Sequence, residues 1–205
     1  GGDLIKEALR HSSSNLYPID SEHSAIWQCL HGNRRDDLNR LIITASGGSF
    51  RNLKREELKN VTKNDALKHP TWSMGAKITI DSATMMNKAF EVMEAHYLFD
   101  VDYQDIDVLL HDESIIHSLI EFKDGAQLAQ LGSPDMRIPI QYALTYPEHS
   151  KAYKEETLDL AKVGTLHFRE MDYDRYPLVK IVKDLAPYGG NIGAVLNGAN
   201  DTAVN

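Results

Sequence analysis

The chain has 205 residues, of which 42% are hydrophobic and 25% charged, and its formal net charge is -8. The length allows one well-packed core and part of a second. The excess of acidic residues argues against a general role in binding nucleic acid or an anionic membrane, since binding either of them needs a basic protein surface. Cys29 is the only cysteine, so an internal disulfide and a cysteine-based zinc site are excluded. The sequence starts without a signal-peptide pattern, and its apolar runs are shorter than the roughly 18 residues that a membrane span needs.

The first half of the chain alternates between predicted helices and strands. The expected elements are the end of a helix over 4–9, a short strand over 15–19, a helix over 21–30 and a buried strand over 41–45. Strand, helix and strand in this order predict a βαβ unit and a parallel sheet. The elements expected next are one or two short surface helices within 52–66, a loop over 69–75, a short strand over 78–80 and a helix from Asp81 or Ser82 to about Phe99.

The second half predicts an antiparallel pair of strands and then a change of pattern. The expected elements are strands over 106–110 and 115–122, a turn at Asp124-Gly125, a returning strand over 126–131 and a helix over 139–146. Residues 150–176 are polar and irregular, as in a linker, and two helices follow within 178–185 and 193–204. Two helices are too few to bury their own apolar faces. We therefore predict an α/β fold with helices on one side of the sheet, divided into a catalytic domain over 1–147, a linker over 148–172 and the start of a helical bundle over 173–205.

Two short stretches could hold a cation and an anion. Asp20 and Glu22 flank a hydroxyl at the start of a predicted helix and could offer hard oxygens to a divalent metal, although N-capping explains the same residues. Ser46 is followed by two glycines at the end of a predicted strand, where backbone N–H groups can approach an anion. A flexible turn is the alternative, and the segment lacks the Lys-Ser/Thr of a Walker motif.

The segment from Asp81 to Glu94 is the most informative stretch. Asn87 and Glu91 are four residues apart on the expected helix, with Lys88 beside them. Ser82 is expected at the amino end of this helix, where the dipole favours anions. One helix face could thus offer a hydroxyl, an amide and an ammonium to a phosphate, and a carboxylate to a metal. The alternative is a solvated face with a Lys–Glu pair.

Two further segments are open to more than one interpretation. The loop HPTWSMG over 69–75 combines a proline, a glycine, a Trp and a Met, as a lid over a site would need, or it is a surface loop pinned by its Trp. His111 and His117 flank Asp112-Glu113-Ser114 but lack a third ligand at helical spacing. We interpret these two histidines as structural.

Together these segments resemble the 1-deoxy-D-xylulose 5-phosphate reductoisomerase family along nearly the whole chain. The stretches that carry the resemblance are IDSEHSAIWQ (19–28), TASGGSFR (44–51), ALKHPTWSMGAKITIDSATMMNKAFEVMEAHYLF (66–99), SIIHSLIEFKDGAQLAQLGSPDMRIPI (114–140), DYDRYPLVKI (172–181) and VLNGANDTAV (195–204). Their order and spacing match the family. The sequence departs from the family pattern in lacking a glycine-rich nucleotide fingerprint, and no Asn-Lys-Glu stretch precedes Asp20.

The resemblance implies a role for each matching residue. It implies metal ligands at Asp20, Glu22 and Glu91, and a phosphate-binding set at Ser46, Ser82, Asn87 and Lys88. It implies a substrate contact at Ser21, a lid at His69, Trp72 and Met74, and positions near a nicotinamide cofactor at Gly75 and Met136. The residues that it implies for catalysis are Glu22, His69, Lys88 and Glu91.

The resemblance also implies the reaction and its setting. The family rearranges 1-deoxy-D-xylulose 5-phosphate and reduces it with NADPH to 2-C-methyl-D-erythritol 4-phosphate in isoprenoid biosynthesis, using Mg²⁺ or Mn²⁺. It implies a homodimer in the bacterial cytoplasm or plastid stroma, phosphonate hydroxamates as inhibitors, and no nucleic-acid or membrane partner. The 205 residues are expected to bind metal and phosphorylated ligand without turnover. A non-catalytic sugar-phosphate binding module and a metal-dependent phosphate hydrolase are the alternatives.

Overall fold

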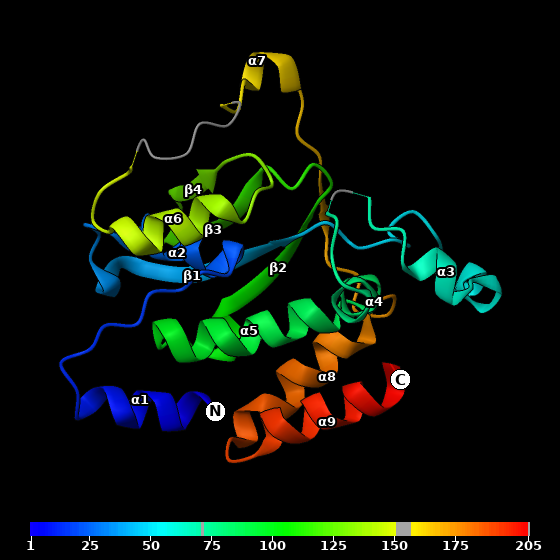
Figure 1. The fold of residues 1–205 in the computed structure, drawn as a ribbon, viewed down its shortest axis with the longest axis horizontal. Coiled ribbons are helices and arrows are strands. Elements are labelled where there is room, and N and C mark those ends of the chain that lie inside the picture. The colour runs from blue at the N-terminus through cyan, green and yellow to red at the C-terminus, as the bar shows by residue number, and fades with distance from the viewer. Residues whose placement is uncertain (71, 151–156, 205) are drawn as a thin grey trace.

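A mixed five-stranded sheet forms the centre of the computed structural model, which describes residues 1–70, 72–150 and 157–204. The sheet order is β4-β3-β1-β2-β5, and Figure 1 shows these strands above the helices α5, α8 and α9. Strands β1 and β2 are parallel, whereas β1–β3, β3–β4 and β2–β5 are antiparallel pairs. The strand bounds are Leu38–Ala45 (β1), Ile106–His111 (β2), Ile116–Phe122 (β3), Gln127–Leu131 (β4) and Phe168–Glu170 (β5).

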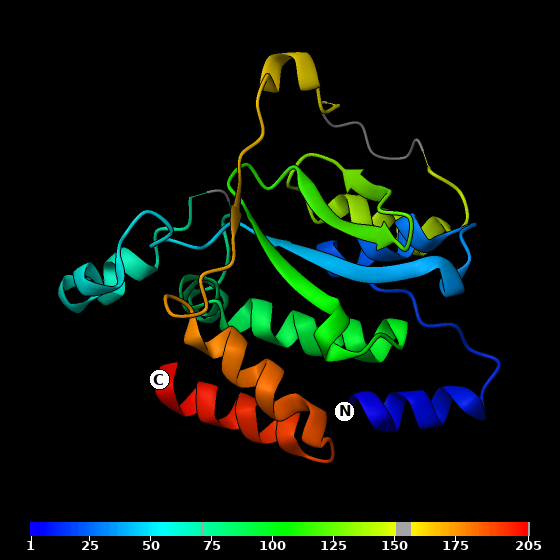
Figure 2. The same cartoon turned by 180° about the vertical axis from the view of Figure 1, so that it is seen from behind.

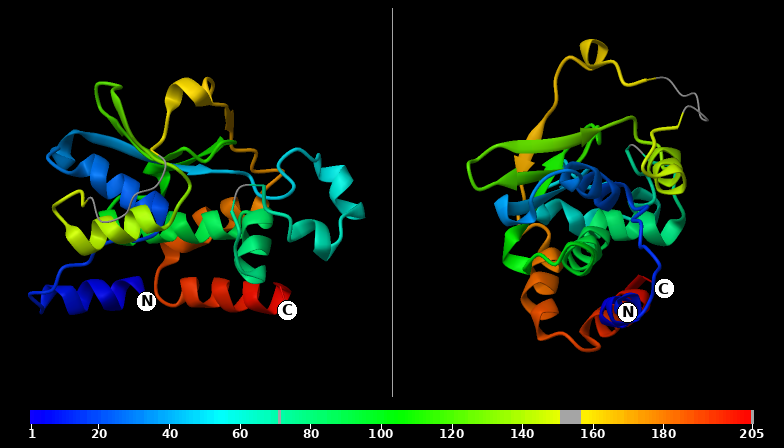
Figure 3. Two further views of the ribbon diagram at one scale, coloured as in Figure 1. Left: turned by 45° about the horizontal axis from the view of Figure 1, so that its top comes forward. Right: turned by 90° about the vertical axis from the view of Figure 1, so that its left-hand side faces the viewer.

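Two helices cover one face of this sheet. Ile26 of α2 and Val92 of α5 are completely buried in one core with Leu41 and Ile43 of β1 and Ile106 of β2. The bounds of these helices are Ser21–Leu30 (α2) and Met86–Phe99 (α5). Figure 3 shows both helices on the same side of the sheet. The chain therefore has the predicted α/β fold with helices on one side.

Of the remaining helices, α3 and α7 project away from this core (Figure 1), and Figure 2 shows α1 and α9 below α5. Their bounds are Gly2–Arg10 (α1), Lys63–Ala66 (α3), Ala76–Thr84 (α4), Arg137–Thr145 (α6), Leu160–Val163 (α7), Pro177–Leu185 (α8) and Ile192–Val204 (α9). Short 3-10 turns are formed by Arg35–Asp37, Arg55–Asn60, Tyr103–Asp105 and Ala186–Tyr188. Val179 and Val182 of α8 are buried against α5, whereas α9 contributes no buried residue in the described part. The two carboxyl-terminal helices thus lie where they were predicted.

Several predicted elements differ from the structure. Residues 15–19 form no strand, so the expected βαβ unit through α2 is wrong, and the parallel pair is instead β1 and β2, joined through α4 and α5. Residues 78–80 belong to α4, where Thr79 donates its hydroxyl hydrogen to the carbonyl of Gly75 at 2.8 Å. The predicted linker includes α7 and the edge strand β5, although 151–156 lie outside the described residues. None of the described helices is both long and apolar enough to cross a membrane.

Candidate metal and phosphate site

A cavity of about 290 Å³ lies at the carboxyl end of β1. This position is the usual one for ligands in α/β sheets. The walls come from α2, α4, α5 and the loops around them, and the lining residues are Asp20, Ser21, Glu22, Thr44, Ala45, Ser46, His69, Trp72, Ser73, Met74, Ile78, Ser82, Met85, Asn87, Lys88, Glu91, His111, Ser114, Ile116, His117 and Met136. Every site residue proposed from the sequence except Gly75 is in this set.

Three carboxylates meet on one side of the cavity. Asp20 is the N-cap residue of α2, Glu22 lies in the first turn of that helix, and Glu91 projects from α5. Oxygen atoms of the three side chains lie within 4.8 Å of one another. Such a set of hard oxygens matches the ligands that Mg²⁺ and Mn²⁺ prefer. The residues present therefore fit a divalent metal.

The ammonium of Lys88 lies against this carboxylate cluster. Its Nζ atom is 2.8 Å from Oε1 of Glu22 and 2.5 Å from Oε2 of Glu91. Asn87 donates an amide hydrogen to the other oxygen of Glu91 at 2.5 Å, and Ser21 donates its hydroxyl to Glu22 at 2.6 Å. The carboxylates are therefore held in place by hydrogen-bond donors that the family resemblance had assigned to substrate binding.

Burial and charge shift the pKa values of this cluster. Burial and the neighbouring Glu22 carboxylate raise the pKa of Glu91 well above its usual range, although Lys88 opposes them. Burial by itself lowers the pKa of Lys88, but the Glu22 and Glu91 carboxylates outweigh it and raise the value. A divalent cation at this position would relieve the repulsion between the carboxylates.

A second polar group forms the opposite side of the cavity around His69. Nε2 of His69 is 3.2 Å from Oγ of Ser46 and 3.1 Å from Oγ of Ser82. Its Nδ1 accepts a hydrogen bond from the backbone N–H of Trp72 at 2.9 Å, so in the neutral ring Nε2 carries the hydrogen. Burial is the main cause that lowers the pKa of His69, followed by the charge of Arg51. The side chain therefore favours the neutral form and brings two hydroxyls to one point.

Gly48 explains why the two serines are close. It has a φ of +70°, and a Cβ atom built there would lie 2.4 Å from the carbonyl oxygen of Ser82 and 2.7 Å from Cα of Ala83. The loop after β1 can thus approach the end of α4 only because residue 48 has no side chain. Ser46 and Ser82 are placed by this contact.

Ser82 is not at a helix amino terminus as predicted. It lies in the last turn of α4, which ends because Met85 adopts a left-handed conformation with φ of 62°. A new helix, α5, then begins at Met86. The expected dipole contribution to anion binding at Ser82 is therefore wrong, although the hydroxyl itself faces the cavity.

The segment predicted as a lid lies over the cavity. Trp72 and Met74 line it, and both are partly exposed, whereas Thr71 lies outside the described residues. Gly75 is the N-cap of α4 and is absent from the cavity wall, with no described atom within 4 Å of where its Cβ would be. Met136 lines the cavity from the residue that precedes α6.

The sequence analysis missed several wall residues. His111 is fully buried, and its Nε2 accepts hydrogen bonds from the backbone N–H groups of Ile115 and Ile116, both at 3.1 Å. This pattern agrees with the structural role predicted for His111, yet the ring also lines the cavity, as does His117. The signal that could have found them is their place between two strands that meet at the end of β1.

Fold and site together define an α/β domain with a carboxylate cluster and a hydroxyl pair around one cavity. Residues 16–99 match the model of the 1-deoxy-D-xylulose 5-phosphate reductoisomerase C-terminal domain, and residues 131–205 match the model of the DXP reductoisomerase C-terminal domain. The chain belongs to the 1-deoxy-D-xylulose 5-phosphate reductoisomerase family.

Curated relatives agree with this assignment. The reductoisomerase of Exiguobacterium sp. (strain AT1b) is 57% identical over 203 residues, and that of Geobacillus sp. (strain WCH70) is 56% identical over 203 residues. Each alignment covers 99% of this chain and 53% of the relative. The chain thus spans about half the length of the curated relatives it matches.

Solved structures show the same fold. The reductoisomerase from Zymomonas mobilis in complex with NADPH superposes with a TM-score of 0.92 at 43% identity, covering 100% of this chain and 52% of that one. A DOX-P reductoisomerase in complex with NADPH, fosmidomycin and magnesium also has a TM-score of 0.92, at 42% identity, covering 99% of this chain and 52% of that one.

Proposed function

We propose that these residues form the metal- and phosphate-binding part of an enzyme that converts 1-deoxy-D-xylulose 5-phosphate to 2-C-methyl-D-erythritol 4-phosphate with NADPH. The observation that carries the proposal is the convergence of Asp20, Glu22 and Glu91 within 4.8 Å in a cavity that also holds Ser46 and Ser82. Relatives solved with NADPH, fosmidomycin and magnesium support the same substrate class and cofactors.

The carboxylates are proposed to hold one Mg²⁺ or Mn²⁺. A divalent ion at this place supplies Lewis-acid stabilisation for the carbonyl and hydroxyl oxygens of the substrate. Ser21 donates to Glu22 and Asn87 to Glu91, which orients the carboxylates toward one point. Fixing the ligands in this way lowers the cost of ordering them when the ion binds.

The phosphate is proposed to lie between the serines and the amino end of α5. Ser46 and Ser82 present hydroxyls that already share His69 as a hydrogen-bond partner. Asn87 and Lys88 add an amide and an ammonium, and Lys88 would turn from the carboxylates to the phosphate once a metal takes its place. Binding of the remote phosphate then positions the reacting end of the substrate.

The lid is proposed to close over the bound substrate. Trp72 and Met74 give it an apolar inner surface, and His69 connects it to both serines. Gly75 and Met136 are proposed to lie near the nicotinamide ring. Exclusion of water by such a lid strengthens each charged interaction inside.

We propose that the whole protein acts as a homodimer in the bacterial cytoplasm, without a nucleic-acid or membrane partner. The 205 residues by themselves are proposed to bind metal and phosphorylated ligand but not to oxidise NADPH, because a hydride donor must be held within reach of the reacting carbon. A coupled NADPH absorbance assay on this chain tests this, and sustained turnover would contradict it.

The metal assignment is tested by Mg²⁺ titration of Glu91→Gln beside the wild-type chain. We expect one site of this kind per chain and an affinity at least about tenfold lower in the variant, since even outer ligand partners are worth 10–100-fold. Asp184→Asn is the control, because Asp184 is exposed on α8 and pairs with Lys180 outside the cavity. Equal affinity in all three proteins would refute the assignment. Release of inorganic phosphate from a sugar phosphate would favour a hydrolase instead.

A further inference from the structure

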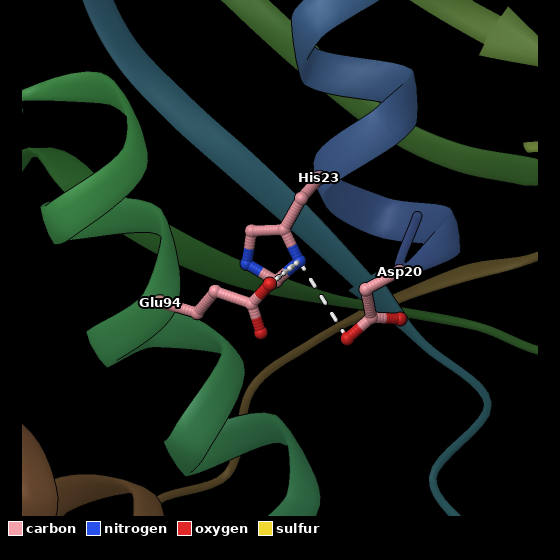
Figure 4. Close-up of side chains that lie close together, drawn as sticks. All are labelled: Asp20, His23 and Glu94. Atoms are coloured by element: carbon pink, nitrogen blue, oxygen red, sulfur yellow. Dashed lines mark ion pairs between the residues drawn. The ribbon is translucent and has the colours of Figure 1, made fainter. Parts of the chain in front are cut away.

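His23 lies between the carboxylates of Asp20 and Glu94, beside the cluster already described. Figure 4 shows its ring between Asp20 at the start of α2 and Glu94 on α5. Nδ1 of His23 is 3.6 Å from Oδ2 of Asp20 and 3.7 Å from Oε1 of Glu94. The imidazole is completely buried, whereas the Glu94 side chain is 44% exposed. Solvent therefore reaches this group from the Glu94 side.

The second ring nitrogen fixes the tautomer of His23. Nε2 is 2.9 Å from the backbone carbonyl oxygen of Glu91, and a carbonyl can only accept. Nε2 therefore carries a hydrogen and donates it. In the neutral ring Nδ1 then has a lone pair, and this atom is buried without a hydrogen-bond partner in the described structure. A buried nitrogen lone pair directed at two carboxylates is unfavourable unless Nδ1 is protonated or a metal ion lies between them.

This arrangement is the one that metal-binding histidines adopt. Such a histidine donates one ring N–H to a carbonyl or carboxylate, which orients the other nitrogen toward the ion. One atom each from Asp20, His23 and Glu94 lies within 4.8 Å of the other two, close enough for a common ion. The spacing along the chain fits as well, because Asp20 and His23 are one helical turn apart.

The ligand atoms determine which ion this group would take. The cluster of Asp20, Glu22 and Glu91 offers oxygen alone and suits Mg²⁺. An imidazole nitrogen with two carboxylates favours the transition series, such as Mn²⁺, Co²⁺ or Zn²⁺. The two groups share Asp20, whose two oxygens could serve one ion each.

The negative charge around the shared Asp20 is only partly neutralised, so a second cation would be stabilised here. Four carboxylates lie here, from Asp20, Glu22, Glu91 and Glu94, against the ammonium of Lys88 and, when it is protonated, the imidazolium of His23. Burial raises the pKa of Glu94; the charge of His23 opposes this, and the Asp20 and Glu22 carboxylates add to it. A second divalent ion would offset this repulsion.

We propose that Asp20, His23 and Glu94 form a second divalent-cation site, selective for transition metals over Mg²⁺, beside the carboxylate cluster. The proposal does not depend on the reductoisomerase reaction. It makes the region around Asp20 a two-metal centre in which one carboxylate is common to both ions.

Equilibrium dialysis of the chain against Co²⁺ tests this proposal. We expect two Co²⁺ per wild-type chain without Mg²⁺, and one retained in a large excess of Mg²⁺. Glu94→Gln should bind one Co²⁺ without Mg²⁺ and none in excess Mg²⁺, whereas Glu91→Gln should keep the Mg²⁺-resistant ion. Glu94 is partly exposed, so its substitution is not expected to unfold the protein, and circular dichroism checks this.

A long-range proton–nitrogen NMR spectrum with Zn²⁺ identifies the ligand atom. The signal of Nδ1 of His23 should shift on Zn²⁺ addition in the wild type and remain unchanged in Glu94→Gln. Two results overturn the proposal: one is Co²⁺ binding that excess Mg²⁺ removes completely, and the other is the same Co²⁺ stoichiometry in wild type and Glu94→Gln. In either case His23 is an imidazolium held between the two carboxylates. If only the Mg²⁺ site is wrong, the chain lacks the ion that depends on Glu91 but keeps the ion that depends on Glu94. The two failures can therefore be told apart.

Discussion

Nζ of Lys88 lies 2.8 Å from Oε1 of Glu22, so the cation expected to bind phosphate is paired with a carboxylate expected to bind metal. The side chains of Lys88 and Glu22 are 7% and 17% exposed, so this pair is largely shielded from water. On the proposed assignment, metal and ammonium compete for the same carboxylates. Binding of the metal would then free Lys88 for the phosphate and couple the two halves of the site.

Lys88→Gln should bind Mg²⁺ more tightly and a phosphonate ligand more weakly. At pH 8 we expect Mg²⁺ affinity to rise about fivefold or more, because a charge within hydrogen-bond distance of the ligands is removed. Phosphonate affinity should fall about tenfold with the lost charge-assisted hydrogen bond. Calorimetry measures both, with Lys180→Gln, which alters an exposed side chain on α8, as the control. Weaker Mg²⁺ binding in Lys88→Gln would contradict the competition.

Gly48→Ala should lower both stability and affinity for the phosphorylated ligand. Its Cβ would meet backbone atoms of Ser82 and Ala83, and overpacking of this kind costs about 1–3 kcal/mol. Gly32→Ala is a matched control, since Gly32 also has a positive φ, of +78°, but no described atom within 4 Å of its Cβ position. Urea unfolding should show the larger loss for Gly48→Ala. Equal losses in the two variants would show that the contact with α4 is unimportant.

Glu121 should contribute to acid sensitivity. It joins β3 to β1 through hydrogen bonds to Arg40, and these bonds, with those from Asn39 and Gln127, lower its pKa from 4.5 to about 2. A carboxyl whose folded pKa is depressed stabilises the fold above its unfolded pKa, and this contribution disappears as the pH falls from about 4.5 to about 2.

The test is the free energy of unfolding between these two pH values. Glu121→Gln should show a smaller decrease than the wild type, whereas Glu148→Gln, which alters an exposed carboxylate outside the sheet, should retain the full decrease. Identical pH profiles for wild type and Glu121→Gln would be evidence against the ion pair.

Self-association should depend on the outer strand of the hairpin. Strand β4 forms one edge of the sheet, and Leu128 and Leu131 on it are 42% and 36% exposed. An exposed apolar edge strand favours pairing with a second chain. Leu128→Lys should therefore shift sedimentation toward the monomer at tens of micromolar. Leu4→Lys is the control, because Leu4 is more exposed, at 76%, but lies on α1, which packs against α5.

The sequence predicted local features of the site well and long-range ones poorly. Asp20, one of the two N-cap positions expected, precedes α2 as its N-cap residue, although its side chain makes no capping hydrogen bond. Residues Ile78–Ile80 were predicted as a strand from their β-branched side chains, but burial of Thr79 and Asp81 places them in α4. Tertiary packing here outweighs the local preference.

Contacts between distant residues could not be read from the sequence. The pairing of Lys88 with Glu22 joins positions 66 residues apart, and the bond from His23 to the Glu91 carbonyl joins positions 68 apart. Only the packing of α2 against α5 brings these atoms together. The resemblance to a family supplied the ligand set, and the structure added the hydrogen bonds that hold it.

Binding of fosmidomycin in the presence and absence of Mg²⁺ tests the central claim most directly. As a phosphonate hydroxamate, it would offer two oxygens to the proposed metal and its phosphonate to the proposed phosphate-binding set of Ser46, Ser82, Asn87 and Lys88. Calorimetric titration of the 205-residue chain should show binding with Mg²⁺ that is lost, or falls at least about tenfold, when Mg²⁺ is removed by a chelator, and Glu91→Gln should weaken the Mg²⁺-dependent part. Binding of equal strength with and without Mg²⁺ would contradict the claim that one cavity holds both metal and phosphate.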